Sequence, residues 1–144
     1  AWHAGAGEWR GFSDINSRSI GIELDNRGDH PFAEPQMVAL EHLIRDIRSR
    51  WPVAPEDVIG HSDMAPGRKF DPGPKFDWAR LARQGLAGPV LCKLTEASFR
   101  SAALAAGYTA PADDEHLLSA ARMRFAPWRD GPETKADKQL YHRL

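Results

Sequence analysis

The pattern of apolar and polar positions predicts a buried strand in the first quarter of the chain. Ile20, Ile22 and Leu24 alternate with smaller or polar residues. Because neighbouring side chains of a strand point to opposite faces, this alternation is typical of a strand with one buried face, and it places Glu23 on the other face. A second, short strand is predicted at residues 58–59, directly before a long loop.

Apolar residues three and four positions apart predict an amphipathic helix that ends near Trp51. Its apolar stripe consists of Met37, Leu40, Ile44, Ile47 and Trp51. Pro35 lies in the first turn, where proline is tolerated, and Pro52 ends the helix. A loop rich in glycine and proline follows at residues 60–74, and a short helix is predicted at residues 77–83.

The last third of the chain is rich in alanine and predicts three short helices. Each is preceded by a side chain that can cap its first turn: Thr95, Asp113 and Thr134. Helices of this length are unstable alone, so they must pack on one another or on the preceding residues. The change in composition divides the chain into a first unit at residues 1–86, a linker at residues 87–94 and a helical module at residues 95–144.

Composition and charge exclude several classes of protein. The 144 residues include 19 Lys and Arg against 20 Asp and Glu, for a formal net charge of −1. A protein that binds nucleic acid through phosphate contacts normally carries a basic excess, so this partner is not expected. No apolar run approaches the roughly 18 residues of a membrane span. The single cysteine, Cys92, excludes an internal disulfide and an all-thiolate zinc site.

The loop after residues 58–59 carries the candidate chemistry, because it holds His61, Lys69 and Asp71. Lys69 and Asp71 are two residues apart, so in extended backbone both side chains leave on the same face. A carboxylate there can bind a cation, and a neighbouring ammonium can stabilise an oxyanion. One histidine and one aspartate suit zinc, whose catalytic sites use three protein ligands. On spacing alone, the commoner interpretation of these residues is a turn with surface charges.

Four sequence blocks favour the zinc site over an ordinary turn with surface charges. They read AWHAG at residues 1–5, SIGIEL at 19–24, IGHSDMAPGRKFDPGP at 59–74 and FDW at 76–78. Together they closely resemble the zinc-dependent N-acetylmuramoyl-L-alanine amidases of type 2, the AmpD-like family. The resemblance implies an α/β fold with a mixed central sheet flanked by helices, a bound Zn²⁺ ion, and hydrolysis of the amide between N-acetylmuramic acid and L-alanine in peptidoglycan.

Matched residue by residue, the resemblance assigns roles to the polar side chains of these blocks. It makes His61 and Asp71 zinc ligands. It makes Glu23 the general base and Lys69 the cation that stabilises the tetrahedral intermediate. Three further residues of the blocks are candidates to line the sugar and peptide cleft: Trp2, His3 and Arg68.

One zinc ligand of the family has no match in this sequence. It is a histidine on a strand upstream of the AWHAG block, and the sequence begins at that block. We therefore expect an N-terminally incomplete catalytic domain that lacks at least one strand and offers zinc two ligands, which weakens zinc binding. An inactive chain is one expected consequence. His3 is the remaining histidine close to the site, and in the family this position is not a ligand.

The C-terminal helices resemble, more weakly, the three-helix peptidoglycan-binding module of some family members. The similarity rests on Phe99, on Gly107 and Tyr108, and on the Leu117-Leu118 pair. A helical cap without a binding role is an almost equal alternative. A wall-binding module favours the periplasm or outer envelope, whereas relatives that recycle wall fragments work in the cytoplasm.

Two functions of different classes are compatible with the sequence. The first is a zinc amidase that acts on peptidoglycan or muropeptides, and the second is a peptidoglycan-recognition module without catalysis. The presence of Glu23, Lys69 and both candidate ligands favours the enzyme, because binding alone does not need this set. If the chain were an unrelated soluble α/β domain, the match of residues 59–74 to the amidase family would have to be a coincidence. The sequence does not predict the oligomeric state.

Overall fold

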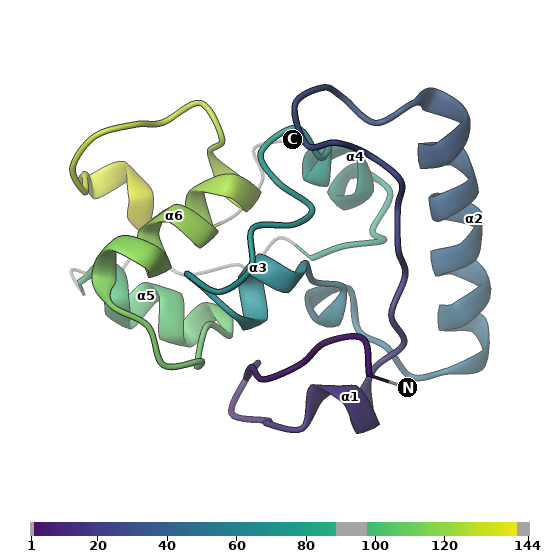
Figure 1. Ribbon diagram of the computed structural model, residues 1–144, viewed down its shortest axis with the longest axis horizontal. Helices are drawn as coiled ribbons and strands as arrows, with labels where there is room; N and C mark the ends of the chain where they lie inside the picture. The colour runs from purple at the N-terminus through teal and green to yellow at the C-terminus, as the bar shows by residue number, and fades with distance from the viewer. Residues whose placement is uncertain (1, 89–97, 141–144) are drawn as a thin grey trace.

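The computed structural model describes residues 2–88 and 98–140, and the elements within them are helical. In chain order these are α1 (Ile15–Arg18), α2 (Glu34–Arg50), η1 (Pro55–Asp57), α3 (His61–Met64), α4 (Trp78–Arg83), α5 (Phe99–Ala106), α6 (Asp114–Phe125) and η2 (Lys135–Lys138), the η elements being 3-10 helices. Figure 1 shows α2 along one flank, α5 and α6 on the opposite flank, and α3 between them.

The expected central sheet, and with it the mixed α/β fold class, is wrong for the described part of the chain. The extended pairing found there is a single antiparallel bridge between Trp9 and Phe12. A strand is held by hydrogen bonds to a neighbouring strand, and the segment at residues 19–24 has no such neighbour among the described residues. Ile20 and Ile22 are consequently 53% and 38% exposed instead of buried.

The helix predicted to end near Trp51 is confirmed as α2, which ends at Arg50, and the helix predicted at residues 77–83 is confirmed as α4. In α2, Met37, Leu40 and Ile44 are buried as the stripe predicts, whereas Trp51 lies just past the helix and is exposed. The α4 helix begins after Asp77, whose carboxylate accepts a hydrogen bond from the Arg80 backbone N–H at 2.9 Å. Of the helices described, none combines the length and apolar character that a membrane span requires.

The C-terminal predictions are confirmed in part. Asp113 caps α6, and Gly107 ends α5 with the positive φ of 114° that glycine adopts readily. Ser98 caps α5, while the predicted cap Thr95 lies outside the described residues. The third predicted helix is wrong in type, because the residues after Thr134 form the short 3-10 helix η2.

Two apolar clusters form the interior. One joins α2 to α4 through Met37, Leu40, Ile44, Phe76, Trp78, Leu81, Leu86 and Ala87. The other is built largely from α5 and α6, and it also contains Trp9 of the N-terminal segment and Met64 of α3. The C-terminal helices therefore share a core with residues from the first half of the chain.

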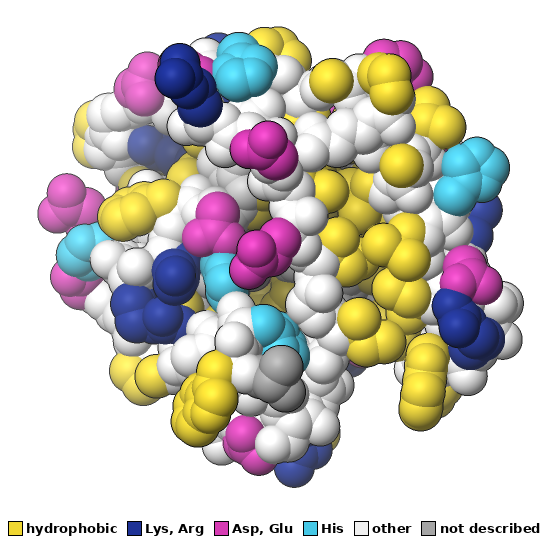
Figure 2. Space-filling model, turned by 45° about the vertical axis from the view of Figure 1, so that its right-hand side comes forward, with side chains coloured by type: hydrophobic (Ala, Val, Ile, Leu, Met, Phe, Trp, Pro, Cys, Tyr) yellow, Lys and Arg dark blue, Asp and Glu magenta, His cyan; other side chains and the backbone are white. Residues whose placement is uncertain are grey.

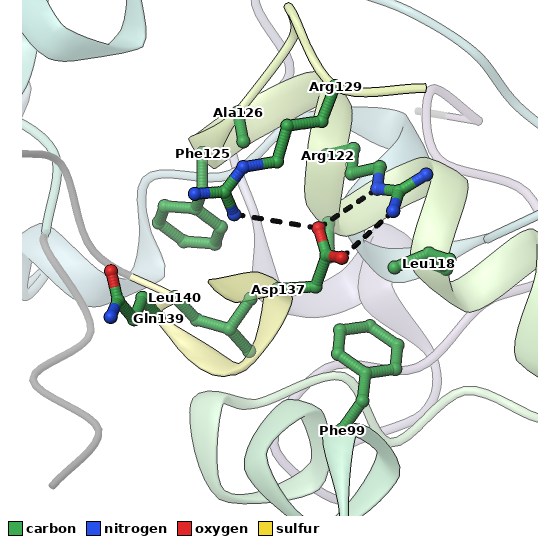
Figure 3. Close-up of a pocket in the computed structure, with 10 residues that line it drawn as sticks. Phe99, Leu118, Arg122, Phe125, Ala126, Arg129, Asp137, Gln139 and Leu140 are labelled. Atoms are coloured by element: carbon green, nitrogen blue, oxygen red, sulfur yellow. Dashed lines mark hydrogen bonds and ion pairs between the residues drawn. The ribbon is translucent and has the colours of Figure 1, made fainter. Parts of the chain in front are cut away.

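A buried carboxylate holds the turn after α6. Asp137 is 3% exposed and accepts two hydrogen bonds from Arg122, at 2.9 and 2.8 Å from Nε and Nη2. The backbone N–H and hydroxyl of Thr134 each donate to it at 2.8 Å. Figure 3 shows Arg122 and Arg129 converging on this carboxylate beside the Phe99 ring. The Arg122 guanidinium lowers the pKa of Asp137 far below its usual value, so the carboxylate is charged at neutral pH.

We expect Asp137→Asn to lower the free energy of unfolding by about 3 kcal/mol at neutral pH, because it leaves Arg122, whose side chain is only 11% exposed, without its counter-charge. The folded-state pKa lies below the unfolded one, so this contribution is full above about pH 4 and is lost as the pH falls through the folded-state value. The difference in free energy of unfolding between wild type and variant, measured by urea unfolding, should therefore be smaller at about pH 3 than at about pH 7.

Exposed Asp130→Asn is the control, with a change of about 0.5 kcal/mol or less at either pH. A gap between wild type and Asp137→Asn that stays constant over this pH range would contradict the role of the charge.

Candidate functional site

The loop at residues 60–74 is folded back on itself by backbone hydrogen bonds. At its start, the Gly60 N–H donates to the Asp63 carboxylate at 2.8 Å, and the Asp63 N–H donates to the Gly60 carbonyl at 3.1 Å. The Ser62 N–H donates to the Asp71 carbonyl at 3.0 Å. This last bond places the end of the loop beside its beginning, although the two residues are nine positions apart in the chain.

The fold of the loop brings together two of the residues singled out from the sequence, His61 and Asp71. His61 Nδ1 lies 2.6 Å from Asp71 Oδ2, and the two side chains are 26% and 59% exposed. The other ring nitrogen, Nε2, lies 2.8 Å from the His3 carbonyl oxygen. A carbonyl oxygen can only accept, so Nε2 carries a hydrogen. Nδ1 therefore faces the carboxylate either as part of an imidazolium or with a lone pair that a cation would bind.

His3 contributes its backbone to this arrangement. The His3 and Ala4 N–H groups both donate to Asn16 Oδ1 at 2.9 Å, which fixes the carbonyl that His61 contacts. The His3 ring is turned to Ser19, with Nε2 2.8 Å from the hydroxyl oxygen. A Cβ on Gly21 would lie 2.7 Å from this ring, so glycine makes the close approach possible. Sequence reasoning missed Asn16.

Arg68 also reaches the N-terminal segment. Its guanidinium donates to the Ala4 carbonyl at 3.0 Å and to the Ala6 carbonyl. In the structure this side chain thus holds the backbone next to His3, and its role against substrate stays a prediction. Trp2, the third candidate for lining the cleft, is 91% exposed.

Glu23 and Lys69 are not hydrogen-bonded to the His61–Asp71 pair in the structure. In the part of the chain that the structure describes, no hydrogen bond or ion pair joins either side chain to the pair, and Glu23 is exposed. Figure 2 shows acidic, imidazole and basic side chains gathered near the centre of one face, beside a hollow lined by apolar side chains. The proposed roles of Glu23 and Lys69 stay predictions.

The residues fit a zinc site in part. An imidazole nitrogen and a carboxylate oxygen converge, and both are ligand types that zinc prefers. The Nε2–H bond from His61 to a backbone carbonyl is also the contact that commonly orients a metal-binding histidine. Over residues 2–88 and 98–140, however, no group of three or more His, Cys, Asp or Glu side chains could hold a metal ion. A third protein ligand is therefore not found among the described residues.

A buried polar cluster lies behind the loop, and sequence reasoning missed it. Asp63 is fully buried, and its carboxylate accepts hydrogen bonds from Tyr108 Oη at 2.6 Å and from Arg124 Nη1 at 2.7 Å. Arg124 and Tyr108 are 3% and 1% exposed. One local signal existed: on α6, Arg124 falls on the buried stripe, seven residues after Leu117 and three after Ala121. An arginine in an apolar stripe indicates a buried partner.

Comparison with known proteins identifies the family to which this sequence is similar. The sequence pattern of the N-acetylmuramoyl-L-alanine amidase family matches residues 1–74. N-acetylmuramoyl-L-alanine amidase AmiD of Escherichia coli strain K12 is 48% identical over an alignment of 95 residues that covers 60% of this chain and 34% of AmiD. The 1,6-anhydro-N-acetylmuramyl-L-alanine amidase AmpD of Enterobacter cloacae is 42% identical over 81 residues, 56% of this chain and 43% of that protein.

Solved structures agree with the sequence match. The complex of E. coli AmiD with the substrate anhydro-N-acetylmuramic acid-L-Ala-D-gamma-Glu-L-Lys aligns with a TM-score of 0.82 at 36% identity, covering 98% of this chain and 66% of that one. AmpDh3 of Pseudomonas aeruginosa in complex with anhydromuramic pentapeptide aligns with a TM-score of 0.81 at 31% identity, covering 97% and 67%. This chain spans between a third and a half of the AmiD and AmpD sequences that it matches. The chain belongs to the N-acetylmuramoyl-L-alanine amidase family.

Proposed function

We propose that this chain carries part of an amidase site that hydrolyses the bond between N-acetylmuramic acid and L-alanine in peptidoglycan or its fragments. The observation that carries the proposal is the His61–Asp71 pair, in which a nitrogen and an oxygen face each other at 2.6 Å while Nε2 is engaged with the His3 carbonyl. The anhydromuropeptides bound by AmiD and AmpDh3 support a muropeptide as the substrate class.

We further propose that His61 and Asp71 supply two ligands to a zinc ion. Bound zinc would polarise the scissile carbonyl and acidify a water molecule. The His3 carbonyl holds the His61 ring by its Nε2–H, so that Nδ1 points toward Asp71. The chain thereby orients one ligand against the other before any ion binds.

The remaining chemistry falls to two exposed or half-exposed side chains, Glu23 and Lys69. The Glu23 carboxylate would take a proton from the attacking water as the new C–O bond forms. It would return that proton to the leaving amine nitrogen as the C–N bond breaks. The Lys69 ammonium would stabilise the negative charge that develops on the carbonyl oxygen of the substrate.

The substrate would also indicate the compartment in which the protein works. Intact peptidoglycan as the substrate would favour the periplasm or outer envelope, and peptidoglycan fragments would favour the cytoplasm.

Zinc binding provides the first test. In equilibrium dialysis against zinc, the chain should bind zinc weakly through its two ligands, and His61→Ala should bind much less because one of the two neighbouring ligands is removed. The matched control is His42→Ala, on the exposed face of α2, which should retain as much zinc as wild type. The measurement is zinc per chain by elemental analysis. Equal zinc content in the two variants would rule out His61 as a ligand.

Hydrolysis provides the second test. With an anhydro-N-acetylmuramyl peptide as substrate, Glu23→Gln should lower kcat by about 10²- to 10⁴-fold, the usual contribution of a general base, with KM little changed. Asp25→Asn, two residues further along the same exposed segment, is the control and should keep wild-type kcat. The released peptide is quantified by mass spectrometry.

Substrate binding without any turnover in the zinc-loaded wild-type chain would contradict the amidase proposal. That result would favour a module that recognises peptidoglycan without cleaving it.

A further inference from the structure

The buried cluster behind the loop connects the C-terminal helices to the candidate site. We infer that Arg124 and Tyr108 are positioning residues, which act through Asp63 to hold α3 so that His61 faces Asp71. This inference rests on the proposed function, because it concerns the orientation of a proposed zinc ligand. The C-terminal helices would then contribute to catalysis through the geometry of the loop, whether or not they bind peptidoglycan.

The position of the Asp63 carboxylate is set by its hydrogen-bond donors. Tyr108 Oη donates to Oδ1 at 2.6 Å, and Arg124 Nη1 and the Gly60 N–H donate to Oδ2 at 2.7 and 2.8 Å. The residue is 0% exposed, so water cannot replace a lost donor. A charge in such a place is tolerated only with its partners, and it is therefore held where they converge.

Asp63 controls the backbone on both sides of His61. The carboxylate belongs to the residue two positions after His61, and it binds the N–H of Gly60, one position before. The intervening helix α3 has only four residues, His61–Met64, and a helix of one turn is not stable by itself. Its geometry must come from bonds to the rest of the molecule, and the cluster provides its buried side-chain bonds.

The two donors are themselves fixed. Arg124 Nη2 donates to the Val58 carbonyl at 3.0 Å, and the guanidinium lies over the Trp78 ring, 4.0 Å from its centroid. The Tyr108 ring packs edge-on against Trp9, with ring centroids 5.2 Å apart. Burial, with the neighbouring Asp63 charge, raises the pKa of Tyr108 well above its usual value, so its hydroxyl remains a donor at neutral pH.

The chain offers a matched control on the same helix. Arg122 of α6 also binds a buried aspartate, Asp137, through two hydrogen bonds, and both carboxylate side chains are 1% exposed. The Arg122–Asp137 ion pair stabilises the turn at Thr134, whose backbone N–H donates to the Asp137 carboxylate. Among the described residues, no hydrogen bond links it to the loop at residues 60–74. Loss of either arginine charge removes an ion pair to a buried aspartate, although Asp137 keeps Arg129 at 3.5 Å, and of the two arginines only Arg124 bonds to α3.

The test compares Tyr108→Phe, Arg124→Met and Arg122→Met in the full chain without zinc. Tyr108→Phe keeps the ring and removes one donor, so it reports on positioning even if Arg124→Met does not fold. The His61 imidazole nitrogens are followed by NMR, and backbone hydrogen exchange is followed by mass spectrometry. Tyr108→Phe and Arg124→Met should shift the His61 signals and speed exchange at residues 60–65 about tenfold, the typical effect of losing a bond to a charged group. Exchange in α2 should stay unchanged.

Arg122→Met should leave the His61 signals at their wild-type positions. Equal shifts in the Arg122→Met and Arg124→Met variants would overturn the inference, since they would indicate general loosening of the C-terminal helices. Unchanged His61 signals in Tyr108→Phe would overturn the role of Tyr108. In an active chain, Arg124→Met should lower kcat with little change in KM, and Arg124→Lys should recover part of the loss. If the wild-type chain does not hydrolyse the substrate, but the variants change the His61 signals as expected, the proposed function is refuted and the positioning role of Arg124 and Tyr108 is retained.

Discussion

A carboxylate shut off from water must have its lone pairs matched by donors, and the interior of this protein is arranged around one such group. Asp63 receives a donor from its own turn, one from Tyr108, two residues after α5, and one from α6. Satisfying this charge requires that parts of the chain 45 and 61 residues away lie at fixed distances from it. The orientation of α3, and of the His61 ring on it, then follows from electrostatics in the core.

The two apolar clusters show how this requirement is met. Tyr108 and Met64 belong to the cluster around α5 and α6, while Trp78 belongs to the cluster around α2 and α4. The Arg124 guanidinium binds Asp63 and lies over Trp78, so a single side chain bridges both parts of the interior. A flat, delocalised cation suits this place, because it can donate in its plane and stack through its face.

Local sequence signals predicted what local physics determines. The 3.6-residue period indicated α2, the cap Asp113 indicated the start of α6, and the loop at residues 60–74 was evident from its glycines and prolines. The prediction of a sheet was wrong because the alternation at residues 19–24 indicates only which side chains share a face of a strand. It says nothing about a neighbouring strand with which that segment could pair. For the same reason Asp63 was missed, since its partners are remote in sequence.

The candidate site shows the same division. The sequence block at residues 59–74 pointed to His61 and Asp71, which the folded loop does place side by side. The bond from Asn16 to the backbone at His3, which orients the carbonyl behind His61, left no recognisable pattern in the sequence. Residues that act through backbone groups are hard to predict, because many side chains could stand in the same place.

The hydrogen bonds between the loop and the N-terminal segment all use main-chain atoms of that segment. His61 donates to the carbonyl of residue 3, Arg68 donates to the carbonyls of residues 4 and 6, and the N–H of Glu8 donates to the carbonyl of Met64. Every amino acid presents the same carbonyl. The identity of buried Ala4 is therefore constrained by the space around it, and that of exposed Ala6 is not fixed by the bond that its carbonyl accepts. This surface of the site can change its side chains in evolution, and with them its contacts to ligands, while the support behind His61 remains intact.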